Sequence, residues 1–210
     1  AERLIVIFAD RGEARELFDV LTRVATQADA LAALAPTLQK VAANPGLVDR
    51  VLDLAQEPTA LTVDKALALG ELMLAAKRYD DAQQFFDQAI AAAPKQAANL
   101  TLGWGLALFV AEEHERAAEV FQQGVDNQLL EAGDPAFHYY LSVALEMAGH
   151  TDRALAAARE AAAMRADSAE YAARVAWILQ HAGRTQEAIE NNKSLISKFS
   201  DVRDPAIRDV

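Results

Sequence analysis

Four histidines are the residues best suited to metal binding or proton transfer in this sequence. They are His114, His138, His150 and His181. A zinc site needs two or three ligands on one face, commonly His at i and i+4 with a nearby carboxylate. No two of these histidines have that spacing, and His114 is followed by Glu115 without the second His of a zinc-protease helix. We therefore expect no metal site, and histidines that lie in solvent at turns and helix edges.

Adjacent carboxylates, which could form a general acid–base pair, occur at Asp80-Asp81 and Glu112-Glu113. Both pairs lie where a turn leads into a helix, and acidic residues are favourable there because the helix N-terminus carries a partial positive charge. A catalytic pair needs burial in a cleft to shift its pKa, which a turn does not provide. The glycines are dispersed, the serines isolated, and cysteine is absent, so no phosphate loop or nucleophile is indicated. The sequence predicts a protein without enzyme activity or cofactor.

The formal net charge of −11 at pH 7 argues against a nucleic-acid-binding surface, because such surfaces cluster Lys and Arg. We interpret it as an acidic exterior that keeps the protein soluble. No apolar run approaches the roughly 18 residues that a membrane-spanning helix needs, so we expect no membrane insertion. A sequence without cysteine fits the cytoplasm and the periplasm equally well.

A repeat of about 34 residues must position all of these side chains. Apolar residues recur at intervals of 34, 34, 35, 37 and 34 residues, at Ala14, Val48, Ala82, Ala117, Ala154 and Ala188. This self-similarity indicates one supersecondary unit copied about six times. Apolar residues make up 52% of the chain and aromatic residues only 7%, which favours helices packed through Ala and Leu. Such arrays usually offer a long binding surface instead of a reaction centre.

The clearest copy runs from residue 63 to residue 96, with two helical segments on either side of a turn at Lys77–Tyr79. Its pattern of Leu-Gly, a large apolar residue, Ala, Phe, Ala and Pro is carried by Leu69, Gly70, Met73, Ala82, Phe86, Ala89 and Pro94. On these residues the chain resembles the tetratricopeptide repeat (TPR) family. The resemblance implies an all-α fold, a right-handed α-solenoid of TPR-like helical hairpins.

The resemblance divides the chain into four TPR-like repeats at 63–96, 98–131, 135–168 and 169–202. Degenerate TPR-like helical repeats are expected at 1–62, and 203–210 looks like the start of a further helix or a tail. Within the degenerate part we expect helices near 30–43 and 47–56, with Pro36 kinking or interrupting the first. Asn192 stands where the pattern has Phe, either at an exposed end of the array or as a tolerated substitution. Both chain ends fit a segment of a longer array or frayed termini.

In the TPR family the first helix of each hairpin lines a concave groove that binds a partner. Mapping this arrangement onto the sequence selects a mainly apolar set, called the predicted stripe: Leu67, Glu71, Leu74, Leu102, Leu106, Phe109, Val110, Tyr139, Val143, Glu146, Met147, Trp177, Gln180 and His181. An exposed apolar surface of several hundred Å² usually marks a binding site. The alternative is that many of these side chains pack inside the array.

The resemblance therefore implies a non-catalytic protein–protein interaction scaffold that binds a peptide or helix in its concave groove. The expected partner is apolar or amphipathic, with basic flanks facing Glu71 and Glu146, and self-association stays open. One alternative is a TPR segment of a bacterial envelope or exopolysaccharide assembly or secretion protein. Another is a regulatory array attached to an enzyme outside this segment. The Ala-rich composition favours a bacterial source.

Overall fold

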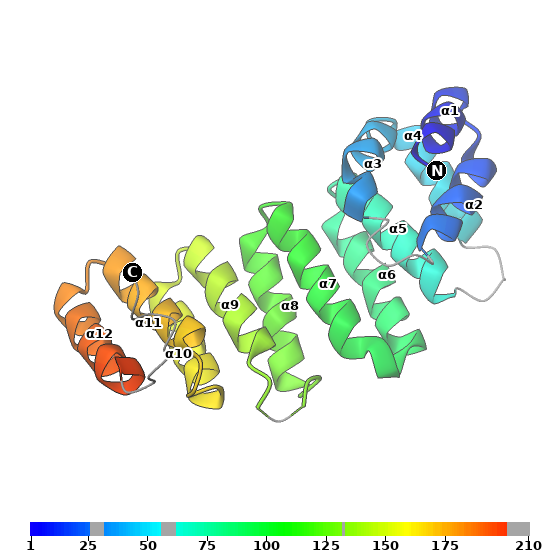
Figure 1. Ribbon diagram of the computed structural model, residues 1–210. Coiled ribbons are helices and arrows are strands. Elements are labelled where there is room, and N and C mark those ends of the chain that lie inside the picture. The colour runs from blue at the N-terminus through cyan, green and yellow to red at the C-terminus, as the bar shows by residue number, and fades with distance from the viewer. Residues whose placement is uncertain (26–31, 56–61, 132, 201–210) are drawn as a thin grey trace, which may run out of the picture. The chain divides into compact units, whose positions relative to one another are not determined.

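The computed structural model describes residues 1–25, 32–55, 62–131 and 133–200, and all regular structure within them is helical (Figure 1). The chain forms two compact units, unit 1 (Ala1–Ala107) and unit 2 (Leu108–Val210). Unit 1 contains α1 (Glu2–Arg11), α2 (Ala14–Ala25), α3 (Ala35–Ala42), α4 (Pro45–Ala55), α5 (Val63–Ala75), α6 (Tyr79–Ala92) and most of α7 (Ala97–Val110). Unit 2 contains α8 (His114–Asp126), α9 (Ala136–Met147), α10 (Thr151–Met164), α11 (Ala169–His181) and α12 (Thr185–Ser200). The prediction of an all-α fold made of helical hairpins is confirmed.

A left-handed residue ends the first helix of five hairpins and lets the chain reverse. These residues are Gly12, Lys77, Glu112, Gly149 and Gly183, with φ between 57° and 85°. In each turn the next backbone N–H donates to the carbonyl five residues earlier at 2.8–3.0 Å, as His150 does to Leu145. This closing bond satisfies one of the carbonyls that a helix end leaves without a partner. The bond therefore fixes the residue at which the next helix starts.

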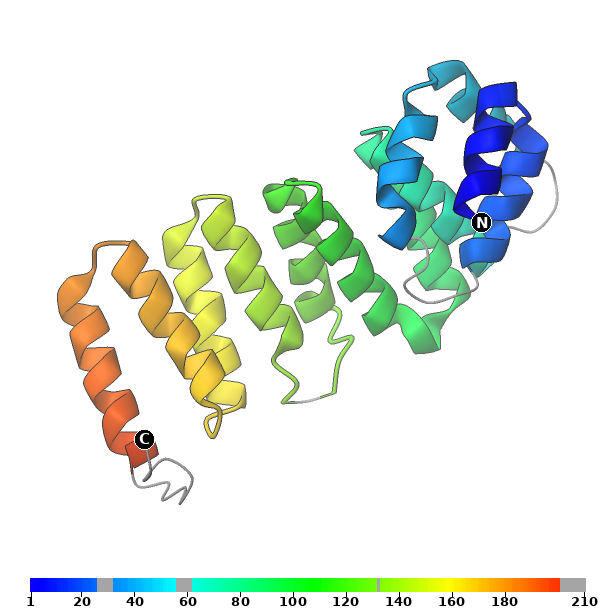
Figure 2. The same ribbon diagram turned by 45° about the horizontal axis from the view of Figure 1, so that its top comes forward.

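Unit 2 packs each helix against the next one along the chain (Figures 1 and 2). Contacts between α8 and α9 and between α9 and α10 are the most extensive, followed by those of α11 with α10 and with α12. The buried side chains are mostly Ala and Leu, together with Phe121 and Phe137. Gly124 on α8 allows the closest approach, because a Cβ atom there would overlap the Phe137 ring of α9. Small residues thus let neighbouring hairpins dock tightly.

The centre of unit 1 is an aromatic stack between α6 and α7. The rings of Phe86 and Trp104 lie 4.2 Å apart, and the Trp104 indole N–H donates to Gln83 at 2.9 Å. Gly70 of α5 faces the same ring, since a Cβ atom there would come within 2.7 Å of Phe86. The Leu-Gly and Phe positions of the repeat pattern therefore touch each other. Both aromatic side chains are buried.

The N-terminal hairpins of unit 1 pack differently from those of unit 2. Helix α5 packs mainly against α2, α3 and α6, and makes few contacts with α4, the helix before it in sequence. As a result α5 is enclosed on several sides, with the run from Leu69 to Met73 buried apart from Glu71. Here the chain departs from the neighbour-to-neighbour packing seen in unit 2.

The helix expected near 30–43 is interrupted next to Pro36, as predicted. A 3-10 helix covers Ala32–Leu34, and α3 begins at Ala35 with Pro36 in its first turn. Proline is well placed there because its missing N–H would have no helical partner. Residues 30 and 31, residue 56 and the predicted segment 203–210 lie outside the described residues. Asn192 is exposed on α12. Among the described residues, no helix is long and apolar enough to cross a membrane.

Candidate functional site

The predicted stripe lies on the first helices of successive hairpins. Its unit 1 members come from α5 and α7, and its unit 2 members from the end of α7, from α9 and from α11. None of the fourteen residues is fully buried, and Glu71 is half-buried. Val110 is 81% exposed, Met147 57% and Trp177 53%. The large apolar residues of the stripe are thus more accessible in unit 2 than in unit 1, where Leu106 is 37% exposed and Leu67, Leu74 and Leu102 are half-buried.

The unit 1 part of the stripe contains one carboxyl group with an altered protonation equilibrium. Burial raises the pKa of Glu71 from 4.5 to about 7. The cause is desolvation, which penalises the charged form. The charged form of Glu71 is therefore disfavoured, and this part of unit 1 is less acidic than the sequence indicates.

The unit 2 part of the stripe is rich in aromatic contacts. Tyr139 packs edge-on against Tyr140 and Tyr171, with ring centroids 5.5 and 5.6 Å apart. Trp177 stacks on His181 at 3.9 Å, and the His181 Nδ1 atom lies 2.9 Å from the Trp177 carbonyl oxygen. These pairs hold large flat side chains in defined positions. Because Tyr171 belongs to α11, the Tyr139 contact joins α9 to α11.

An ion pair next to these rings also joins α9 to α11. Arg174 and Glu146 approach to 2.6 Å, with only 11% and 21% of their side chains exposed. The same guanidinium donates to the Ser142 hydroxyl at 3.1 Å and to the Ser142 carbonyl oxygen at 3.0 Å. The Ser142 hydroxyl in turn donates to the Tyr139 carbonyl oxygen at 2.7 Å. Glu146 is therefore already neutralised within the protein.

Sequence reasoning missed Arg174, Ser142 and Tyr171. All three support stripe residues and come from the same first helices, but none belongs to the stripe itself. The spacing of 28 residues between Glu146 and Arg174 differs from the repeat period, so the pattern gave no signal for the pair. An unusual feature that could have drawn attention is an arginine in the middle of a helix whose neighbours are mostly alanine.

The histidines lie at helix ends and starts. The His150 Nε2 atom lies 2.7 Å from a Glu115 carboxylate oxygen, and both side chains are about half exposed. The ring of His114 packs against Phe109 at 4.9 Å. Within the described part of the chain, no group of three or more His, Cys, Asp or Glu side chains could hold a metal ion.

Comparison with known proteins identifies the fold. No protein-family model and no curated protein matches the sequence. Among solved structures, the chain is similar to one from Podosopora anserina described as a kinesin light chain with nearly identical TPR-like repeats. The two share 15% sequence identity over 88% of this chain and 98% of that one, with a TM-score of 0.52. It is also similar to MamA from Desulfovibrio magneticus RS-1, with 13% identity over 97% of both chains and a TM-score of 0.50. These likenesses confirm the predicted TPR-like repeat fold.

Proposed function

Because the fold is TPR-like, we propose that this protein is a non-catalytic interaction scaffold and that α9 and α11 bind an amphipathic helical segment of a partner protein. The binding surface, called the α9–α11 face, consists of Tyr139, Val143, Met147, Trp177 and His181. TPR-like folds are built from stacked hairpins that expose one side of each first helix, and such arrays usually serve as binding surfaces.

The observation that carries the proposal is the exposure of Met147 and Trp177 beside rings held in place by their neighbours. Large apolar side chains gathered on one face favour a binding site. Trp and Tyr are also the residues that most often dominate binding energy at interfaces. A helix that inserts two or three apolar side chains at one-turn spacing would cover this face.

The charges around the face favour an apolar partner more than a basic one. Glu146, which the sequence alone assigned to a basic flank of the partner, has its charge neutralised by Arg174. We infer that apolar contact dominates, so binding should weaken only slightly as the salt concentration rises.

A phage-displayed library of amphipathic helical peptides, selected against the wild-type chain, tests the proposal. Selected peptides should bind the double variant Met147→Ala/Trp177→Ala with an affinity reduced by at least about 2 kcal/mol. Ile196→Ala serves as a matched control, because Ile196 is a large apolar side chain that is 68% exposed on α12. Peptides that bind the double variant as well as they bind the wild type would place the binding surface elsewhere and overturn the proposal.

A further inference from the structure

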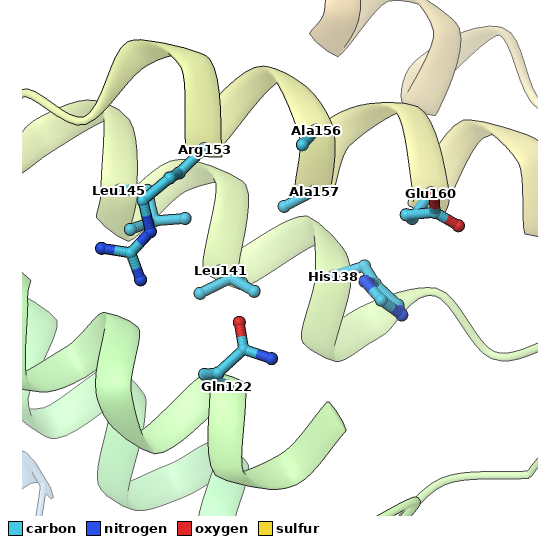
Figure 3. A pocket seen from close by; sticks show the side chains of 8 residues that line it. All are labelled: Gln122, His138, Leu141, Leu145, Arg153, Ala156, Ala157 and Glu160. Atoms are coloured by element: carbon cyan, nitrogen blue, oxygen red, sulfur yellow. The ribbon is translucent and has the colours of Figure 1, made fainter. Parts of the chain in front are cut away.

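Unit 2 contains a hollow that the α9–α11 face does not use. It has a volume of about 250 Å³ and lies between α8, α9 and α10 (Figure 3). Its floor is formed by Leu141, Leu145 and Ala157, which are all buried. Helical geometry of 3.6 residues per turn places Leu141 and Leu145 on nearly the opposite side of α9 from Val143 and Met147. The hollow is therefore a separate surface.

Two opposite charges flank this hollow. Arg153 and Glu160 both come from α10, and Figure 3 shows them at opposite ends, with Ala156 and Ala157 between them. They are seven residues apart, which on an α-helix corresponds to about 10 Å. A surface with an apolar floor, a cation at one end and an anion at the other is complementary to a ligand with the reverse arrangement.

Both charges are available to a ligand. The nearest carboxylate to Arg153 is Glu115, at 4.0 Å, and its other oxygen already lies 2.7 Å from His150. Among the described residues Glu160 forms no ion pair within 4.0 Å, and its side chain is exposed. His138 at the same end has its pKa lowered, chiefly by burial and against the influence of Glu160. At neutral pH the hollow therefore has one positive and one negative flank.

The size of the hollow decides which kind of segment fits. A helix is about 10 Å across with its side chains, too wide for a space of this volume between three helices. An extended segment places alternate side chains on one face, and residues i and i+4 lie about 13 Å apart. The flexible Arg153 and Glu160 side chains can span that length.

We propose that the hollow between α8, α9 and α10 binds an extended segment of a partner protein in the order acidic, apolar and basic at alternate positions. The acidic side chain pairs with Arg153, the apolar one enters the space above Leu141 and Leu145, and the basic one pairs with Glu160. The two-charge requirement distinguishes this site from the α9–α11 face, where apolar contact dominates.

The test uses three blocked pentapeptides as probes: Glu-Ser-Leu-Ser-Lys, Glu-Ser-Leu-Ser-Glu and Lys-Ser-Leu-Ser-Lys. Each is titrated into the full chain carrying 13C-labelled leucine methyl groups, and the shifts of the Leu141 and Leu145 methyl signals are followed by NMR. We expect saturable shifts, with the mixed-charge peptide binding at least about five-fold more tightly than either like-charge peptide.

Three exposed positions on α10 provide the variants and their control. Arg153→Glu should shift the preference to the Lys-Ser-Leu-Ser-Lys peptide, whereas the control Arg159→Glu, on the same helix but outside the hollow, should retain the wild-type order. Ala156→Trp should fill the hollow and abolish the shifts while the far-UV circular dichroism spectrum stays unchanged. The proposal is overturned if the two leucines show no saturable shift, if all three peptides bind equally, or if N-acetyl-leucinamide binds as tightly as the mixed-charge peptide. The last result would indicate a small-molecule site.

Discussion

The carboxyl groups of Glu71 in unit 1 and Glu146 in unit 2 have different surroundings. In unit 1, α5 is enclosed by α2, α3 and α6, and Glu71 loses water and has a raised pKa. In unit 2, Glu146 of α9 meets Arg174 of α11 and has its charge matched. The difference shows that glutamates on first helices of the same chain can have different surroundings, one desolvated and the other paired with an arginine.

The two units also differ in which helices pack against each other. Unit 2 follows the chain, so each helix contacts its sequence neighbours, whereas in unit 1 α5 reaches back to α2 and α3. Contacts between nearby helices can open locally in a repeat protein, because each hairpin depends mainly on its neighbours. We therefore expect variants in one unit to loosen that unit first.

The largest effect should come from Phe86→Ala in unit 1. Phe86 is 3% exposed and stacks on Trp104, so its removal leaves a cavity and should reduce the free energy of unfolding by about 3 to 5 kcal/mol. Urea denaturation measures the loss. Hydrogen exchange should speed up in α5 and α6 and stay unchanged in α11 and α12. A loss below about 1 kcal/mol, or faster exchange throughout the chain, would contradict separate responses of the two units.

Arg174→Ala should produce the next largest effect, in unit 2. It leaves the mostly buried Glu146 carboxylate without its partner, at a cost of about 3 kcal/mol. Arg165→Ala is the matched control, because Arg165 and its partner Asp167 are 52% and 81% exposed and such surface pairs contribute about 1 kcal/mol or less. Thermal unfolding of both variants gives the comparison. Equal losses would mean that Glu146 and Arg174 behave as a surface pair.

Glu71→Gln should remove a pH dependence that belongs to unit 1. The folded pKa of Glu71, about 7, lies above the ordinary 4.5, so the folded state binds the proton more tightly. This contribution is fully present at low pH and is lost as the pH rises through about 7. Between pH 5 and pH 8, the free energy of unfolding of the wild type should fall by on the order of 2 kcal/mol more than that of Glu71→Gln. Parallel stability curves for the two proteins would show that Glu71 has an ordinary pKa.

The smallest effects should come from glycine substitutions, and they should have opposite signs. Gly103 lies exposed within α7, and a Cβ atom there would meet nothing within 4 Å. Gly103→Ala should therefore raise the free energy of unfolding by up to about 1 kcal/mol, because alanine favours a helix more than glycine does. Gly70→Ala and Gly124→Ala would push on Phe86 and Phe137, and each should destabilise by about 1 kcal/mol after the gain in helix propensity. Chemical denaturation separates these cases. A stabilising Gly124→Ala would mean that α8 and α9 approach less closely.

Local rules of sequence were enough to predict the hairpins. The signals for the hairpin at 63–96 lie close together in sequence: the Leu69-Gly70 pair, the turn at Lys77 and Phe86. The helices that they predict, α5 and α6, are present. Pro36 lies in the first turn of α3, because proline interrupts a helix interior but is favourable in a first turn. The packing of α5 against α2 and α3 depends on contacts between distant residues, for which the repeat pattern holds no information.

The site was predictable only in outline. Placing Met147 and Trp177 on the stripe needed only the repeat register, and both side chains are exposed. Their roles in binding stay predictions. The partners of the stripe, above all Arg174 for Glu146, depend on how two hairpins meet in three dimensions. The raised pKa of Glu71 depends on burial, which no motif in α5 records.

The left-handed turns have a consequence for how this sequence can change over generations. Gly149 and Gly183 adopt positive φ at no steric cost, but Lys77 and Glu112 occupy the same turn position with φ of 57° and 64°. A side chain in this conformation carries roughly 1 kcal/mol of strain. Mutation to glycine at these two codons would relieve it, so natural variants with Gly there should be tolerated and should allow other, destabilising changes to accumulate nearby.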